Sequence, residues 1–303
     1  MKTEKSQQIS VQSPELMEIK NHLIRLRGNP GCNPDASIIV PINAQADLWT
    51  IRTLFADILR YTGKYAIEII LVVNNYPPSN PPGEIDLFRS LGFGVVAVPS
   101  ARRSGEVVIV SARALGVRAA KSEITIHFDA DCRVADINAL LDWSIESLNA
   151  GASLAYSHVG YYELRKLTSV RAKITIHHTI RRFKRNILRI PTTRGSNYAV
   201  NKSLFLELYD AGKLSVDLQI GPAVKLTGCR IAYSGHPSLR VLTSGRRFRG
   251  GWIKMFGYFR YRLHFNLKAT PTRKRDVTRT TWDGFDKESD NRDAHVLAET
   301  QPD

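Results

Sequence analysis

Residues 124–131 read Ile-Thr-Ile-His-Phe-Asp-Ala-Asp, an apolar run that ends in two acids. The apolar part is typical of a buried strand, so Asp129 and Asp131 stand where that strand ends. Ligands of open α/β sheets bind at the carboxyl edge of the strands. Side chains alternate along a strand, and a carboxylate can hold a hard divalent cation together with substrate phosphates. The stretch predicts a metal and phosphate site, although an Asp-x-Asp pair also occurs in solvated turns.

The surrounding sequence favours an α/β fold. Apolar runs predict strands at 37–41, 67–73, 95–98, 124–128 and 153–157, and helical periodicity predicts helices at 47–62, 84–91, 108–121 and 135–149. This alternation indicates a mainly parallel sheet with right-handed crossover connections.

Composition narrows the class of protein. The chain has 303 residues, of which 43% are hydrophobic, enough for one large α/β domain or two small ones. There is no run of about 18 apolar residues and no apolar stretch at the N-terminus, so we expect neither a transmembrane helix nor a secretory signal. Cys32, Cys132 and Cys229 are odd in number and far apart, which favours the reducing cytoplasm.

The net charge of +15 is unevenly distributed. Residues 245–275 contain ten Lys and Arg and no acid, and a second basic run spans Arg165 to Arg189. Such runs indicate a polyanionic partner, which includes nucleic acid, anionic lipid and phosphorylated ligands. A solvated basic surface is the alternative.

Seven segments, in order, resemble the family 2 glycosyltransferases. They are residues 37–41, 68–75, 112–120, 128–133, 194–205, 216–233 and 243–252. The resemblance implies the GT-A (Rossmann-like) fold of nucleotide-diphospho-sugar transferases, a three-layer sandwich with a mainly parallel central sheet.

The resemblance also implies a donor site. Asp131 would hold Mn²⁺ or Mg²⁺ on the donor diphosphate, and Asp129 would contact the nucleoside. The remaining donor-binding residues would be Pro41, Asn43, Asn74, Arg113, Arg246 and Arg247. Guanidinium groups suit a diphosphate because they bind its oxygens bidentately and stay charged.

On the acceptor side, the resemblance implies that Gly195, Ser196 and Asn197 bind the acceptor. Asp217 aligns with the family's catalytic Asp, and Val216 stands where the family has Glu. A base at this place takes the proton of the acceptor hydroxyl as its oxygen attacks C1 of the sugar. A helix N-cap is the structural alternative for Asp217.

Two departures from the family pattern concern the nucleotide. Ala44-Gln45 replaces the usual Asn-Glu pair, and Asn74 stands where the base-binding strand usually ends in Asp. An amide donates as well as accepts hydrogen bonds. A UDP-sugar is favoured, and GDP- and dTDP-sugars remain open.

We expect four regions along the chain. Residues 1–35 form a partly flexible N-terminal extension, and residues 36–245 form the GT-A domain, with a nucleotide-binding half (36–134) and an acceptor-binding half (135–245). Residues 246–270 form a basic aromatic segment and 271–303 a disordered tail. As a helix, residues 251–268 would carry aromatic side chains between basic ones, which suits either an anionic membrane surface or packing on the domain.

Together these features predict a metal-dependent inverting glycosyltransferase of the hexosyltransferase type. Its acceptor would be a sugar or a lipid-linked hydroxyl, and its place the cytoplasm or the inner face of the cell membrane. A nucleotidyltransferase of related fold, attacking the α-phosphorus, is one alternative, but it needs no base at Asp217. A non-catalytic nucleic-acid-binding protein is another, suggested by the charge and the interleaved aromatics. A catalytically dead relative that only scaffolds other proteins is a third alternative, which the presence of Asp129, Asp131 and Asp217 disfavours. We do not expect a nucleic-acid partner.

Overall fold

The computed structural model describes residues 14–28, 32–101, 107–162 and 168–245, with residues 257 and 260. The predicted basic aromatic segment, apart from those two residues, and the predicted tail lie outside this range, as do Arg246 and Arg247.

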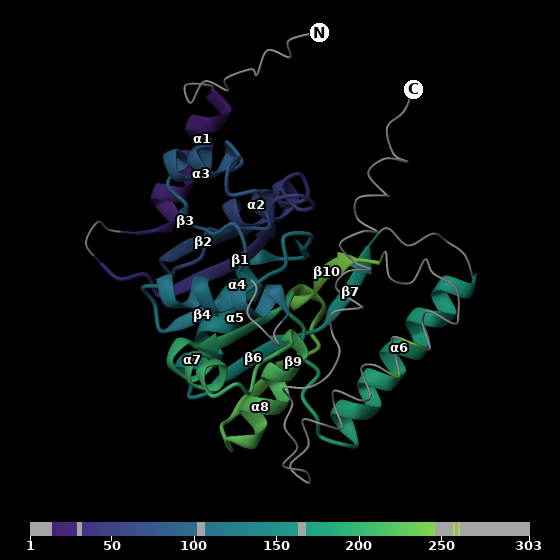
Figure 1. The fold of residues 1–303 in the computed structure, drawn as a ribbon. Helices are drawn as coiled ribbons and strands as arrows, with labels where there is room; N and C mark the ends of the chain where they lie inside the picture. Colours follow the sequence, from purple (N-terminus) through teal and green to yellow (C-terminus); the bar gives the residue numbers. More distant parts are fainter. Residues whose placement is uncertain are drawn as a thin grey trace.

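A seven-stranded sheet forms the centre of the molecule (Figure 1), and its strand order is β3-β2-β1-β4-β8-β6-β9. Every strand runs parallel to the others except β8, which is antiparallel to both of its neighbours. The mainly parallel α/β sheet predicted from the sequence is confirmed. The strands are β1 (Ala36–Asn43), β2 (Ile67–Asn74), β3 (Gly94–Ala97), β4 (Ile124–His127), β6 (Leu154–Ser157), β8 (Tyr198–Asn201) and β9 (Ile231–Ser234).

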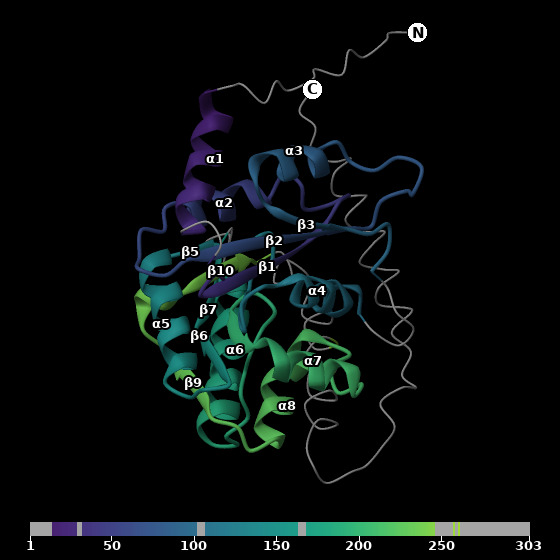
Figure 2. The ribbon, with the colours of Figure 1, turned by 90° about the vertical axis from the view of Figure 1, so that its left-hand side faces the viewer.

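Helices cover both faces of this sheet, which confirms the three-layer arrangement (Figure 2). One face carries α1 (Pro14–Leu26), α2 (Ile51–Leu59), α3 (Glu84–Leu91) and α5 (Ile137–Asn149). The other carries α4 (Val108–Ala119), α7 (Lys202–Asp210) and α8 (Ile220–Leu226). The central strands β1 and β2 are buried along nearly their whole length, as their Ile- and Val-rich sequences require.

A second, three-stranded sheet lies beside the first. It has the order β5-β10-β7 and consists of β5 (Arg133–Val134), β10 (Val241–Ser244) and β7 (Val159–Tyr162). Because β5 directly follows the acids at the end of β4, this small sheet lies against the predicted site. The sequence analysis does not predict it, since two- to four-residue strands carry little periodicity.

The helix α6 (Thr168–Asn186) stands at the edge of the molecule, outside the helix layers (Figure 1). The sequence analysis treats this stretch only as a basic run. Among the described residues, no helix combines the length and the apolar character that a membrane span needs.

Two local features differ from the sequence-based boundaries. The helix α2 begins at Ile51, not at 47, because the Asp47 carboxylate accepts a hydrogen bond from the Asn43 amide (3.0 Å) and closes a turn there. The N-terminal helix α1 buries Leu23 and Leu26 in the main core, so this part of the N-terminal extension is packed.

The helix α4 lies against the sheet at Gly116, and this contact yields a stability prediction. A Cβ on Gly116 would lie 2.6 Å from Ile39 Cγ2 and 2.9 Å from Val72 Cγ2, both in buried side chains. We expect Gly116→Ala to lower the free energy of unfolding by about 1–2 kcal/mol, because overpacking outweighs the gain in helix propensity.

Urea denaturation measures this change. Gly83→Ala is the control, because nothing lies within 4 Å of a Cβ placed there, and it should change stability by less than about 0.5 kcal/mol. Equal stability of both variants would show that α4 does not pack on the sheet this closely.

Candidate active site

A buried arginine organises the carboxyl edge of the sheet. Arg113, on α4, is fully buried, and its guanidinium donates to three oxygens. These are Asp129 Oδ1 (2.5 Å), Asp217 Oδ1 (3.2 Å) and the backbone carbonyl of Phe128 (3.3 Å). One side chain therefore joins the acid that follows β4 to an acid that lies 88 residues further along the chain.

Asp217 is presented by a short 3₁₀ helix, η1 (Asp217–Gln219), that runs into α8. The Gln219 side chain accepts hydrogen bonds from the amides of Ser215 (2.7 Å) and Val216 (3.0 Å), which fixes the start of this helix. The N-cap position belongs to Val216, and the Asp217 carboxylate turns toward Arg113. The capping alternative for Asp217 does not describe its geometry.

Gly195 brings the predicted acceptor loop against these charges. A Cβ on Gly195 would overlap the Asp217 carboxylate and would lie 2.7 Å from Arg113 Nη2. Only glycine lets the backbone approach both groups. The loop thus contacts the Asp217–Arg113 pair through its backbone.

The other two predicted acceptor residues are buried and hold the loop. Ser196 accepts a hydrogen bond from the Cys132 thiol through its carbonyl (3.7 Å), which ties the loop to the turn after β4. The Asn197 amide donates to the Ser157 hydroxyl at the end of β6. The two residues are only 1% and 3% exposed, so in this structure they support the loop from within, and their contact with an acceptor stays a prediction.

Asp129, Asp131 and Cys132 place three potential ligand atoms within 4.8 Å of one another. Burial, followed by the charges of Asp129 and Asp131, raises the pKa of the Cys132 thiol well above its ordinary value. Cys132 therefore stays protonated and acts as a hydrogen-bond donor. The carboxylate oxygens of Asp129 and Asp131 remain as ligands, a set that fits Mg²⁺ or Mn²⁺ and not a thiophilic ion.

The small sheet positions Asp131. The Thr243 hydroxyl, on β10, donates to Asp131 Oδ1 (3.1 Å), and the Tyr162 hydroxyl, on β7, donates to the Asp131 carbonyl (2.7 Å). Sequence reasoning missed both roles: Tyr162 belongs to none of the seven segments, and Thr243, which begins the last of them, is 112 positions from Asp131 along the chain.

The electrostatics of the site are set by Arg113. Burial alone would lower its pKa, but the negative charges of Asp217 and Asp129 outweigh burial and raise it. Next to it, burial and then the charge of Arg113 lower the pKa of His127 well below its ordinary value. His127 is therefore neutral and stacks on Tyr198 at 4.4 Å between ring centroids. Arg113 therefore supplies the positive charge at the floor of the site, and the aromatic layer beneath it is uncharged.

The predicted donor residues on β1 and β2 lie at the same edge of the sheet. Asn43 and Asn74 pair at the ends of the two strands, and Pro41 is buried within β1. The Asn43 side-chain oxygen accepts from Asn75 Nδ2 (2.9 Å) and from the Gln45 amide (3.0 Å). The buried Asn74 amide donates to the carbonyls of Ile42 (3.1 Å) and Val72 (3.4 Å). Their roles toward a nucleoside stay predictions.

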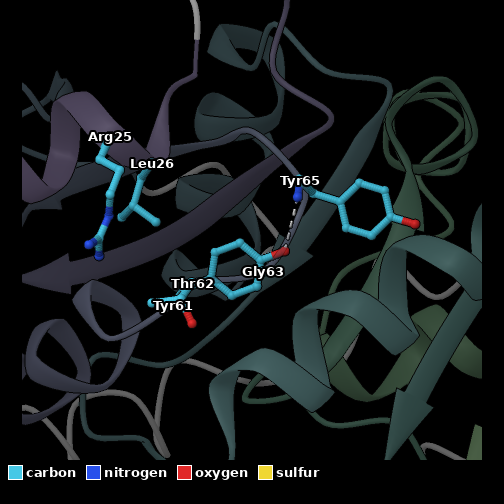
Figure 3. Close-up of a pocket in the computed structure, with 6 residues that line it drawn as sticks. All are labelled: Arg25, Leu26, Tyr61, Thr62, Gly63 and Tyr65. Carbon is cyan, nitrogen blue, oxygen red and sulfur yellow. Dashed lines mark hydrogen bonds between the residues drawn. The ribbon is translucent and has the colours of Figure 1, made fainter.

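A small cavity elsewhere does not belong to this site. It measures about 130 Å³ and is lined by Arg25, Leu26, Tyr61, Thr62, Gly63 and Tyr65 (Figure 3). The Tyr61 hydroxyl accepts a hydrogen bond from the Tyr65 amide (3.3 Å) at its wall. It lies near the start of β2, at the opposite end of the strands from Asp129, and the Tyr61 hydroxyl in its wall also donates to Asp142 Oδ1 (2.6 Å).

No protein-family model matches the chain, and no curated protein does. Solved structures that are similar include the mannosyltransferase PcManGT from Pyrobaculum calidifontis in complex with GDP-Man and Mn²⁺. It has 15% identity and a TM-score of 0.45, over 81% of this chain and 72% of that one.

Two further similar structures are S. aureus TarS in complex with UDP-GlcNAc (15% identity, TM-score 0.48, 69% of this chain) and GalNAc-T7 with UDP, GalNAc and Mn²⁺ (17% identity, TM-score 0.49, 75% of this chain). The chain spans 58% and 48% of their lengths. Membership of family 2 stays a prediction.

Replacing Arg113 tests the central ion pairs. We expect Arg113→Met to lower the free energy of unfolding by about 3–5 kcal/mol, because it leaves two carboxylates facing each other without their cation. Chemical denaturation measures the loss.

Arg118→Met is the matched control on the same helix. Arg118 pairs with Asp210 at the surface, with side chains 43% and 51% exposed, so its loss should cost less than about 1 kcal/mol. A cost for Arg113→Met no larger than that for Arg118→Met would contradict the buried bridge.

Proposed function

We propose that this chain is a metal-dependent inverting glycosyltransferase that moves a sugar from a nucleotide-diphosphate donor to an acceptor hydroxyl. The observation that carries the proposal is the bridge through Arg113, which holds the Asp129–Asp131 end of the site and Asp217 in one cluster. A donor-binding acid group and a candidate base are thereby fixed next to each other.

Asp131, with Asp129 beside it, would hold the divalent cation. When bound, the ion supplies charge that stabilises the leaving diphosphate. Thr243 orients the Asp131 carboxylate, and Tyr162 fixes its backbone. These contacts restrain the Asp131 rotamer, which favours a preorganised ligand over a solvated surface acid.

Asp217 would take the proton of the acceptor hydroxyl as the acceptor oxygen forms its bond to C1 of the sugar and the bond from C1 to the diphosphate oxygen breaks. The proton passes to Asp217 Oδ2, since Oδ1 accepts from Arg113. Arg113 is then a positioning residue: it aims Asp217 while Gly195 brings the acceptor loop to the same carboxylate.

A UDP-sugar is the favoured donor, and GDP- and dTDP-sugars remain alternatives. The side-chain amide of Asn74 already donates to two backbone carbonyls. It therefore has less hydrogen-bonding capacity left for the nucleobase of the donor than an unbonded side chain would have. A sugar or lipid-linked alcohol is the expected acceptor, and Arg246 and Arg247 would add charge near the diphosphate.

Asp131→Ala tests the metal assignment. We expect loss of the Mn²⁺-dependent binding of UDP, because the variant removes the carboxylate that Thr243 orients. Isothermal calorimetry with Mn²⁺ and UDP measures the affinity. Asp86→Ala, which removes a surface carboxylate with 87% of its side chain exposed, should bind like the wild type. Unchanged affinity of Asp131→Ala would refute the assignment.

Asp217→Asn tests the base. The amide keeps an oxygen that can accept from Arg113 but cannot take a proton, so we expect donor affinity to persist while transfer falls by about 10²–10⁴-fold. Single-turnover transfer and calorimetry on the same preparation separate the two effects. Wild-type turnover in the variant would place the base elsewhere.

A further inference from the structure

On the helix α6, mainly polar side chains face the domain and several apolar side chains face outward. Its inner face carries charged and imidazole side chains, of which Lys173, His177 and Arg181 are 5%, 2% and 6% exposed. Arg181 donates to the Thr192 carbonyl (2.8 Å), and His177 Nε2 lies 2.6 Å from Arg194 Nη2. A surface helix normally turns its apolar side chains inward. Here polar contacts attach the helix to the domain.

Several apolar side chains of α6 face outward, although Val170 near its start is buried. Ile176, Ile180 and Phe183, with Ile187 just after the helix, are 41%, 36%, 53% and 65% exposed. Their spacing of four, three and four residues places them in one stripe along the helix. Leu188, 48% exposed, follows at the same end. A contiguous exposed stripe of this kind marks an interaction surface.

In the described part of α6, the exposed charged side chains are all basic. Arg171 and Arg182 are exposed on α6, and Arg189 is exposed just beyond it. The sequence has no acid between Glu163 and Glu207. His178, on α6, contacts His158 with 5.0 Å between ring centroids; burial, followed by nearby positive charges, lowers both pKa values to about 4, so both imidazoles are neutral.

We propose that the outer face of α6 docks on an anionic lipid bilayer, with the stripe in the interface and the flanking arginines at the headgroups. An apolar stripe bordered by basic side chains is the pattern of an interfacial helix. Each basic residue near the surface adds attraction to anionic lipid. The predicted membrane contact through residues 251–268 involves a different segment.

Charge excludes two other occupants of the stripe. A second copy packed on it by a two-fold axis would place the same arginines against each other. The segment 246–268 of this chain also carries Lys and Arg without an acid, so it would add like charge to α6. An anionic bilayer complements both features, because its headgroups attract the exposed arginines and its acyl region accommodates the apolar stripe.

Docking through α6 has a consequence for the active site. The inner face of the helix holds Thr192 and Arg194, and the next residue, Gly195, touches Asp217. The acceptor loop would therefore lie close to the lipid surface. This consequence rests on the proposed function, whereas the docking itself does not.

Co-sedimentation of the full chain with vesicles tests the docking. We expect binding to phosphatidylcholine vesicles that contain phosphatidylglycerol, weaker binding at high salt, and little binding to pure phosphatidylcholine. The double variant Ile180→Gln/Phe183→Gln should partition about tenfold less into anionic vesicles, and Arg182→Gln should also bind less.

Leu226→Gln is the matched control, because Leu226 is equally apolar and 53% exposed but lies on α8. It should bind vesicles like the wild type. Wild-type binding by the double variant, with its circular dichroism unchanged, would overturn the proposal and assign membrane contact to another segment. A wild-type dimer in sedimentation velocity that the double variant abolishes would overturn it in favour of a second copy.

Discussion

The buried guanidinium of Arg113 is the interaction on which the site depends. A buried cation is costly unless it is paired and hydrogen-bonded. Arg113 meets this requirement with two carboxylates and one backbone carbonyl, and its face lies 5.9 Å from the Tyr198 ring centroid. Since Asp129 follows β4 and Asp217 begins η1, the pairing fixes two distant parts of the chain against α4. The planar guanidinium group has five N–H donors and can bond both acids at once, whereas a lysine ammonium cannot span both acids with the same geometry.

The surroundings of Arg113 follow from this constraint. Gly195 has no side chain because Asp217 and Arg113 occupy the space. Cys132 is buried beside the acids, stays protonated and donates to the acceptor loop. The neutral His127 fills the layer beneath without a second charge. Gly195, Cys132 and His127 thus fit around the Arg113 cluster without adding a second positive charge, and the chemical roles of Asp129, Asp131 and Asp217 belong to the proposed function.

Much of the fold could be predicted because the central strands carry strong apolar runs and the helices between them are amphipathic. Asp129 and Asp131 could be singled out because two acids at the end of an apolar strand stand out locally, whereas Asp217 was indicated only by the resemblance to the family. The contacts of Thr243 and Tyr162 with Asp131 could not, since they join residues more than 30 positions apart through strands of four residues. The helix α6 could not be predicted for a different reason: polar residues form most of its inner face and several apolar residues face outward, so its sequence has no core-facing apolar stripe.

The identity of the nucleotide product tests the proposed chemistry most directly. The protein would be incubated with UDP-, GDP- and dTDP-sugars and Mn²⁺, with and without a chelator, and the released nucleotide identified by chromatography. Attack at C1 of the sugar predicts a nucleoside diphosphate, formed only with the metal present, because the bond from C1 to the diphosphate oxygen is the one that breaks. Release of a nucleoside monophosphate would indicate attack on the α-phosphorus and contradict glycosyl transfer. Cleavage of none of these donors would contradict the proposal that the Arg113-centred cluster is their site.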